Sequence, residues 1–253
     1  MKTKTRRDAV QSYLAQHKNI FITEMASKLQ VSSMTIRRDL QRLAELGIVT
    51  LVHGGAVLNE GAAYLPAVSA REQQMRKEKN TIGAFCANQV KEGNAIYLDS
   101  GSTTKGIAEA LLERQNIAVL THSLPVMNIL STAKNLQLIS IPGIYDAGTK
   151  GFFGEMARRA IQNFQIDIAF LGISAIDIEN GIMSPDFQDQ AIKLALIEKA
   201  RQKIVVMDHT KIGLRSFTKV CGLAAIDMIV TDKMAEQSFI EKAMRAGVKV
   251  IQV

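Results

Sequence analysis

The chain has 253 residues, 47% of them apolar, which is enough for one or two domains with a buried core. Its formal net charge is +7, and most of the excess lies early, because residues 1–56 hold nine Lys and Arg against four Asp and Glu. A cationic segment of this kind is typical of a module that binds nucleic-acid phosphates. No apolar run approaches the roughly 20 residues of a membrane span. No apolar segment follows the charged start as in a signal peptide, so we expect a cytoplasmic protein.

Cysteine and histidine usage indicates neither disulfides nor a metal centre. Cys86 and Cys221 are far apart and lie in apolar surroundings, which is typical of small core residues in a reducing compartment. Besides these two Cys the chain has four His, without the spacing of a ligand set, so we expect no structural metal and no cofactor.

Three short helices are predicted at the start of the chain, over 6–17, 23–29 and about 32–46. Gly47 follows the third helix, where a left-handed C-terminal cap is expected. Apolar residues repeat at helical spacing in the third helix and should face inward: Ile36, Leu40 and Leu43. Two helices joined by a tight turn, the second with a polar outer face, predict a helix-turn-helix.

The polar face of the third helix is the candidate DNA-contacting surface, because the second helix of such a pair enters the major groove. Ser32 or Ser33 is expected to cap its start. Small Ser33 and Thr35 permit close approach to bases, whereas Arg37 and Arg38 can reach phosphates or guanine edges. The candidate residues on this helix are Ser32, Ser33, Met34, Thr35, Arg37, Arg38, Gln41 and Arg42.

Two β-prone runs, 48–52 and 56–58, flank a glycine pair and predict a hairpin of the kind called a wing. His53 and Gly54 at its turn are further candidates for DNA contact. The alternative for the basic helix is an ordinary solvated face, which is the commoner state of such helices. The coincidence of turn, wing and clustered charge favours DNA binding.

The motif Val31-Ser32-Ser33-Met34-Thr35-Ile36-Arg37-Arg38-Asp39-Leu40, followed by Leu43, Gly47 and His53-Gly54-Gly55-Ala56, resembles the signature of the DeoR family of bacterial regulators. The resemblance implies a winged helix-turn-helix and, for the whole chain, a repressor. The family often has an Arg in the wing before His-Gly-Gly, where this chain has Leu51-Val52. The chain therefore differs where a wing would meet the DNA backbone or minor groove.

The chain is expected to have a DNA-binding domain over 1–58, a linker over 59–76 and an effector-binding domain over 77–253. In the last of these, apolar β-rich runs alternate with helical stretches, which predicts an α/β fold with a doubly wound, largely parallel sheet. The predicted strands are 95–99, 117–121, 136–141, 166–171, 203–208, 228–231 and 248–253. The predicted helices between them are 104–112, 124–132, 156–163, 189–200 and 234–246.

Ligands of such sheets lie at the carboxyl ends of the strands. One predicted end, 99–104, reads Asp-Ser-Gly-Ser-Thr-Thr and opens a helix, so its hydroxyl and N–H groups favour a phosphate. Other ends carry Thr121-His122-Ser123, Pro142-Gly143, 172–175 and 208–211. Alternatives remain for each: a simple helix cap after Asp99, a turn cap at Asp208, a loop histidine at His122 and a solvated lysine at Lys211.

The second half also resembles the DeoR sensor domain, which is similar to ribose-5-phosphate isomerase and the glucosamine-phosphate isomerase group. The resemblance implies a phosphorylated sugar effector held by Asp99, Gly101, Ser102, Thr103, Thr104, Ser123, Gly143, Lys193, Asp208 and Lys211. Three positions depart from the family, which usually has Asn in place of His122, Gly in place of Pro142 and Asp-Gly near Ser174-Ala175.

Three functions are compatible with these patterns. The first is a repressor of a carbohydrate-utilisation operon, relieved by a phosphorylated sugar or sugar acid and acting as a dimer or tetramer on double-stranded DNA. The second is a sugar-phosphate isomerase with a DNA-binding head, although Asp99 and Asp208 lack an evident second acid–base partner. The third is a nucleoid-type DNA binder with an inert body.

Overall fold

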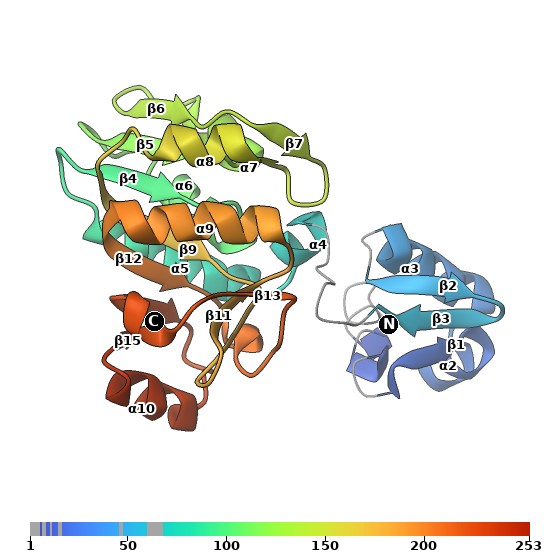
Figure 1. Cartoon of the computed structure of the whole chain (residues 1–253). Coiled ribbons are helices and arrows are strands. Elements are labelled where there is room, and N and C mark those ends of the chain that lie inside the picture. Colours follow the sequence, from blue (N-terminus) through green and yellow to red (C-terminus); the bar gives the residue numbers. More distant parts are fainter. Residues whose placement is uncertain (1–5, 7–8, 11, 15–16, 46–47, 60–67) are drawn as a thin grey trace. The chain divides into compact units, whose positions relative to one another are not determined.

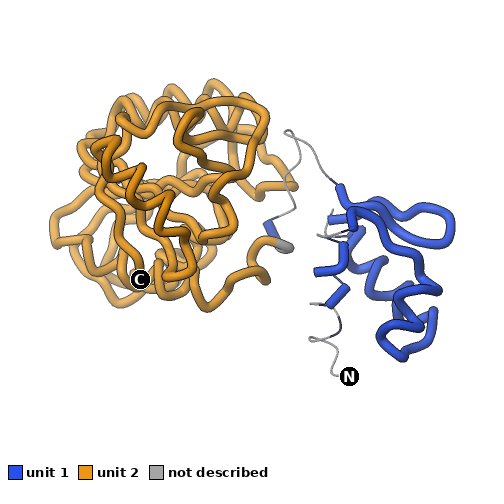
Figure 2. Tube along the Cα trace, turned by 90° about the horizontal axis from the view of Figure 1, so that it is seen from below, with its two compact units in different colours: residues 1–70 blue, residues 71–253 orange. Residues whose placement is uncertain are grey.

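The computed structural model describes residues 6, 9–10, 12–14, 17–45, 48–59 and 68–253. It divides into two compact units, Met1–Ala70 and Arg71–Val253 (Figure 2). The described residues within the predicted helix 6–17 are helical. Gly47, the expected helix cap, lies outside the described residues.

The first unit is a winged helix-turn-helix, as predicted, with one strand that the sequence pattern did not reveal (Figure 1). Its elements are β1 (Asn19–Phe21), α2 (Ile22–Leu29), α3 (Ser33–Glu45), β2 (Val49–Val52) and β3 (Gly55–Leu58). The strands form an antiparallel sheet in the order β1-β3-β2. Gln30, with φ 52°, ends α2 in the left-handed conformation and turns the chain toward α3.

The core of the first unit is built by the residues that helical spacing placed inside. Ile36, Leu40 and Leu43 of α3 are buried and pack with Val10 and Leu14. Apolar side chains of α2, the sheet and the chain before it complete this core: Ile20, Ile22, Met25, Ala26, Ile48, Val49 and Ala56. The unit therefore has its own hydrophobic core.

The second unit is built on a seven-stranded sheet in which every neighbouring pair is parallel. The strands are β4 (Ala95–Leu98), β5 (Ala118–Thr121), β6 (Gln137–Ser140), β9 (Ile166–Gly172), β12 (Ala200–Val206), β14 (Met228–Thr231) and β15 (Lys249–Gln252). Their order is β15-β14-β12-β9-β4-β5-β6, so the chain runs outward in one direction from β4 and in the other from β9. This confirms the doubly wound α/β fold and places the topological switch point between β4 and β9.

Helices cover both faces of this sheet (Figure 1). One face packs against α5 (Arg76–Gln89), α6 (Ser102–Ala110) and α7 (Leu124–Leu130). The other packs against α8 (Glu155–Ile161), α9 (Phe187–Lys199) and α10 (Gln237–Arg245). Strand residues alternate between the two faces, as Ile96 and Leu98 lie in one core and Tyr97 in the other.

Several short elements lie outside the predicted pattern. A hairpin of β7 (Ile144–Asp146) and β8 (Gly151–Phe153) follows β6. A small antiparallel sheet joins β10 (Ala175–Asp177), β11 (Gly181–Ser184) and β13 (Thr218–Cys221). Helix α4 (Val68–Gln73) occupies part of the segment expected as a linker. Two 3₁₀ turns, η1 (His209–Lys211) and η2 (Leu223–Ala225), complete the fold.

The contact between α5 and α6 gives a test of the packing. Gly83 faces Gly106, and a Cβ at Gly83 would lie 2.5 Å from the backbone carbonyl of Gly106. We therefore expect Gly83→Ala to lower the free energy of unfolding by about 1–3 kcal/mol, although Ala is the better helix former by about 1 kcal/mol. Thr81→Ala, on the exposed side of α5, should change it little, and urea denaturation measures both. Stabilisation by Gly83→Ala would contradict the close helix contact.

Candidate functional site

The start and outer face of α3 present the residues proposed to contact DNA. Of the eight candidates at this helix, all are exposed except Thr35, which is half-buried. Met34 is 61% exposed, which makes it a large apolar group available at the surface near the helix start. Arg42 forms an exposed ion pair with Glu45, with 2.9 Å between Nη1 and Oε2. Arg37 and Arg38 point into solvent and have no ion pair recorded among the described residues.

Ser32 caps α3. The Thr35 amide donates to Ser32 Oγ at 3.2 Å, and the two hydroxyl groups are 2.9 Å apart. Of the two serines offered by the sequence, the first therefore caps the helix, and its carbonyl accepts from the same Thr35 amide at 2.9 Å. The hydroxyl groups of Ser32 and Thr35 fix the beginning of the helix that would approach the bases.

A buried ion pair holds α3 against the chain that precedes it. Asp39 is 1% exposed and accepts from Arg6 Nε at 2.6 Å and from Arg6 Nη2 at 3.3 Å. Two parallel N–H donors to one carboxylate fix orientation as well as distance. The neighbouring Arg37 and Arg38 are thereby held on the exposed side, so Asp39 positions the candidate DNA surface.

The wing exposes two large apolar side chains beside its turn. His53 and Gly54 form its turn, and both are exposed, with Gly54 at φ 77°. Leu51 and Val52, which stand where the family often has Arg, are 42% and 47% exposed. The wing thus presents methyl groups in place of a cation.

In the second unit, Asp99 lies at the switch point, directly after β4. It is fully buried, and its carboxylate accepts from the Ser100 amide at 2.8 Å and from the Gly172 amide at 3.1 Å. Gly172 ends β9, so one carboxylate joins the two strands on either side of the switch point. Its position is where doubly wound sheets bind ligands.

Lys193 of α9 neutralises this carboxylate. Its Nζ lies 2.9 Å from Asp99 Oδ2 and 2.6 Å from Asp189 Oδ1, and the lysine is 2% exposed. Ser184 Oγ donates to the other oxygen of Asp189. Burial, together with the nearby Asp189, raises the pKa of Asp99 to about 6, while the two carboxylates raise the pKa of Lys193 above its usual value despite burial.

His122 lies beside Asp99 at the end of β5 and is fully buried. Its Nδ1 is 2.8 Å from the Tyr97 hydroxyl, and its Nε2 is 3.7 Å from Asp99 Oδ1 without a hydrogen bond. Burial, followed by repulsion from Lys193, lowers the pKa of His122 to about 3, so the imidazole is neutral. A neutral ring fits the apolar contact with Phe153, whose ring centroid is 4.9 Å away.

The loop after Asp99 leads into the amino end of α6. Thr104 Oγ1 donates to the carbonyls of Asp99 and Gly101, at 2.7 and 3.0 Å, which folds the loop. In the described chain, no acceptor is recorded for the backbone amides of Ser102 and Thr103. Gly101 and Ser102 are half-buried, whereas Thr103 and Thr104 are buried. Unpaired amides at a helix start form an anion site.

The β7–β8 hairpin lies over the ends of β4 and β5. Ser100 Oγ donates to the Thr149 carbonyl at 3.1 Å, and Ser123 forms a bridge with Gly151. Ser123 is 1% exposed as a result. Gly143 lies at the base of the hairpin, where a Cβ would come within 2.5 Å of the Phe153 carbonyl oxygen. The structure therefore gives Gly143 a packing role, and a ligand role for it stays a prediction.

A second group of charged side chains lies where β12 ends and η1 begins. Asp208 caps η1 by accepting from the Thr210 amide, as the turn-cap alternative anticipated. Its Oδ2 is 3.6 Å from Lys79 Nζ of α5, and Lys79 is 4% exposed. Burial lowers the pKa of Lys79 to about 8; attraction by Asp208 opposes this shift, and repulsion by Lys211 and Arg71 adds to it.

Arg71 of α4 lies between the two groups of charges. Desolvation lowers the pKa of Arg71 to about 10, while Asp189, Asp99 and Glu72 act in the opposite direction. The same arginine lowers the pKa values of Lys79 and Lys211, so these cations repel one another. Apart from Glu72, which is paired with Lys105, the cluster holds four cations and three carboxylates: Arg71, Lys79, Lys193 and Lys211 with Asp99, Asp189 and Asp208. Its surplus of positive charge suits an anion.

The structure thus brings Asp99, Lys193, Asp208 and Lys211 into one charged cluster near the start of α6. The sequence patterns did not reveal Arg71, Lys79 and Asp189 as members of this cluster. Asp189 precedes Lys193 by four residues on a predicted helix, which was an available signal of an ion pair. The departure at Ser174-Ala175 has a structural correlate, since Ala175 is buried in β10 and Ser174 Oγ donates to the Met183 carbonyl.

In the described part of the chain, no group of three or more His, Cys, Asp or Glu side chains is arranged to hold a metal ion. None of its helices has the length and apolar character needed to cross a membrane.

His122 makes the stability of the protein depend on pH. Its pKa is near 6.5 when unfolded and about 3 when folded, so the unfolded state binds the proton between these values and stability falls as the pH falls through them. Between pH 7 and pH 5 this group should remove about 2 kcal/mol of stability. In His122→Asn, the unfolding free energy lost between pH 7 and pH 5 should be about 2 kcal/mol smaller than in the wild type, because the amide oxygen can accept from Tyr97 without titrating. Urea denaturation at both pH values tests this, and equal losses would contradict the neutral buried ring.

Both halves of the chain match known protein families. Residues 6–62 match the DeoR-like helix-turn-helix domain, and residues 74–233 match the DeoR C terminal sensor domain. The glycerol-3-phosphate regulon repressor of Escherichia coli K12 is 30% identical over 232 residues, which are 92% of this chain and 92% of that protein. The HTH-type transcriptional repressor GlcR of Bacillus subtilis 168 is 29% identical over 243 residues, 96% of this chain and 93% of that protein.

Among solved structures, ribose 5-phosphate isomerase A of Methanocaldococcus jannaschii is 16% identical, with a TM-score of 0.40. That alignment covers 54% of each chain, about half of either protein. The family matches and the relatives named above, which are transcriptional repressors, support the regulator over the isomerase alternative. With a helix-turn-helix domain at one end and the sensor domain filling most of the remainder, the chain belongs to the DeoR family of transcriptional regulators.

Proposed function

We propose that this protein represses a carbohydrate-utilisation operon by binding double-stranded operator DNA through α3 and the wing, and that a phosphorylated sugar or sugar acid releases it. The observation that carries the effector class is the surplus of cations at the switch point, beside the start of α6. A phosphate dianion relieves the repulsion among Arg71, Lys79 and Lys211. It also accepts from the unpaired amides of α6.

The relatives support the same assignment. One is named for a glycerol-3-phosphate regulon, and both of those described above are repressors. The effector-binding residues we propose are Asp99, Gly101, Ser102, Thr103, Thr104, Ser123, Gly143, Lys193, Asp208 and Lys211, with Arg71 and Lys79 added. Asp99 and Lys193 neutralise each other's charge in an ion pair, so we propose that they act by positioning the ends of the strands.

The DNA-binding role rests on the surface of the first unit. Exposed Arg37 and Arg38 supply charge next to Ser33, whose small side chain admits close approach to base edges. Helix-turn-helix proteins bind two-fold sites as dimers, so we propose a homodimer or a tetramer acting in the cytoplasm, where operator DNA is found. By linkage, an effector that weakens DNA binding is itself bound more weakly in the presence of DNA.

Arg37 tests the DNA-binding surface. Arg37→Ala should weaken binding by about 1–3 kcal/mol if the guanidinium contacts a base, and should relax sequence preference. Gel-shift titration on a duplex selected from a random pool with the wild-type protein measures both. Arg201→Ala removes the same charge from an exposed site of the second unit and should have little effect. Unchanged affinity in Arg37→Ala would show that α3 is not inserted as proposed.

Lys211 tests the effector cluster. At 100 times its dissociation constant, an effector should add about 2.7 kcal/mol to the stability of the wild-type protein. Thermal melting with a panel that includes glycerol 3-phosphate, hexose phosphates and inorganic phosphate reveals such a ligand. Lys211→Met should lose most of that stabilisation, whereas Lys219→Met, at an exposed lysine of β13, should retain it. If no phosphorylated compound stabilises the wild type, the proposed effector class is wrong.

A further inference from the structure

Helix α4 lies where the chain passes from the first unit to the second. It spans Val68–Gln73, and its residues from Arg71 onward belong to the second unit. Arg71 contributes to the charged cluster, so the six-residue helix at the boundary between the two units in the sequence supplies one of the cations at the proposed effector site. What holds this helix therefore bears on how the two units are connected.

Lys79 connects the end of α4 to the charged cluster. Its ammonium donates to the Arg71 carbonyl at 2.6 Å and to the Gln74 carbonyl at 2.8 Å. An ammonium has three donors, and the remaining side of Lys79 faces Asp208 Oδ2 at 3.6 Å, beyond hydrogen-bond distance. The buried Lys79 ammonium thus binds two backbone carbonyls at the end of α4, and its third N–H points toward the charged cluster.

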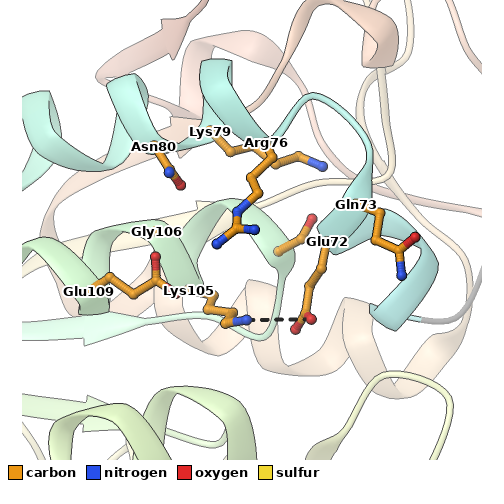
Figure 3. Close-up of a pocket in the computed structure, with 9 residues that line it drawn as sticks. Glu72, Gln73, Arg76, Lys79, Asn80, Lys105, Gly106 and Glu109 are labelled. Atoms are coloured by element: carbon orange, nitrogen blue, oxygen red, sulfur yellow. Dashed lines mark ion pairs between the residues drawn. The ribbon is translucent and has the colours of Figure 1, made fainter. Parts of the chain in front are cut away.

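A second ion pair joins α4 to α6. Glu72 Oε2 lies 3.4 Å from Lys105 Nζ across a cavity of about 180 Å³ between α4, α5 and α6. Figure 3 shows the side chains of Glu72, Lys105 and Arg76 converging on this cavity. Helix α4 is therefore attached on one side by Lys79 and on the other by Lys105.

We propose that an anion bound in the charged cluster tightens α4 through Lys79 and Arg71, and that α4 is the segment that transmits effector binding to the DNA-binding unit. This inference rests on the proposed effector site and adds its regulation. Without an anion, the side chains of Arg71 and Lys79 repel each other, although the Lys79 ammonium donates to the Arg71 carbonyl. An anion between them removes the repulsion and occupies the remaining donor of Lys79, so part of its binding energy orders α4.

Hydrogen exchange of the full-length protein tests the proposal, with inorganic phosphate as the probe and chloride at equal ionic strength as the reference. Calorimetry measures phosphate binding in the same samples. Phosphate should bind and slow amide exchange in peptides that cover residues 68–75. Lys79→Met should raise exchange there by about 10- to 100-fold, the factor expected for losing charged hydrogen bonds, and phosphate should no longer slow it. Lys77→Met, at an exposed lysine of α5, should behave like the wild type.

A second variant covers the case in which Lys79→Met fails to fold. Glu72→Gln removes the ion pair with Lys105 and leaves every cation of the cluster, so α4 should exchange faster without phosphate and be slowed again by it. Glu109→Gln changes another carboxylate lining the same cavity, and should leave exchange unaltered. Phosphate binding without any change in α4 exchange overturns this inference but leaves the effector site standing. Failure of phosphate and of every sugar phosphate to bind overturns both.

Discussion

The ion pair between Lys193 and Asp99 is the interaction on which the second unit depends. The Asp99 carboxylate joins the ends of β4 and β9 through amide donors, and Lys193 brings α9 and Asp189 to the same point. Each of these charges is buried, so removal of one would leave its partners uncompensated in a medium where that costs several kcal/mol. The pair therefore fixes the switch point, and the start of α6 and the surplus cations take their positions from it.

The parts of this architecture that follow a local period were predictable. All seven strands of the parallel sheet and five of its helices were expected, because alternating apolar runs and helical stretches of the right length specify them. The placement of Asp99, Asp208 and Lys211 at one edge of the sheet was also predictable, since the carboxyl ends of parallel strands lie there. In the first unit, the spacing of Ile36, Leu40 and Leu43 was enough to orient α3.

The remainder depends on contacts between residues distant in sequence. Arg71 lies in the segment expected as a linker, and no local pattern marks Lys79; only the fold places them near Asp189 and Asp208. The short strands of the β7–β8 hairpin, three residues each, are too brief to show a period, yet they cover Ser123. His122 was interpreted as a loop histidine, but Tyr97 and Phe153 enclose it in a neutral state.

The connectivity of the parallel sheet has a kinetic consequence. Its two central strands meet through Asp99 and Gly172, which are 73 residues apart in the chain, whereas the helices and hairpin of the first unit make short-range contacts around a core of their own. Loop closure over long separations slows folding, and segments synthesised first fold first. During translation the first unit should therefore fold early, so the emerging chain carries a folded helix-turn-helix domain before the sensor domain has assembled.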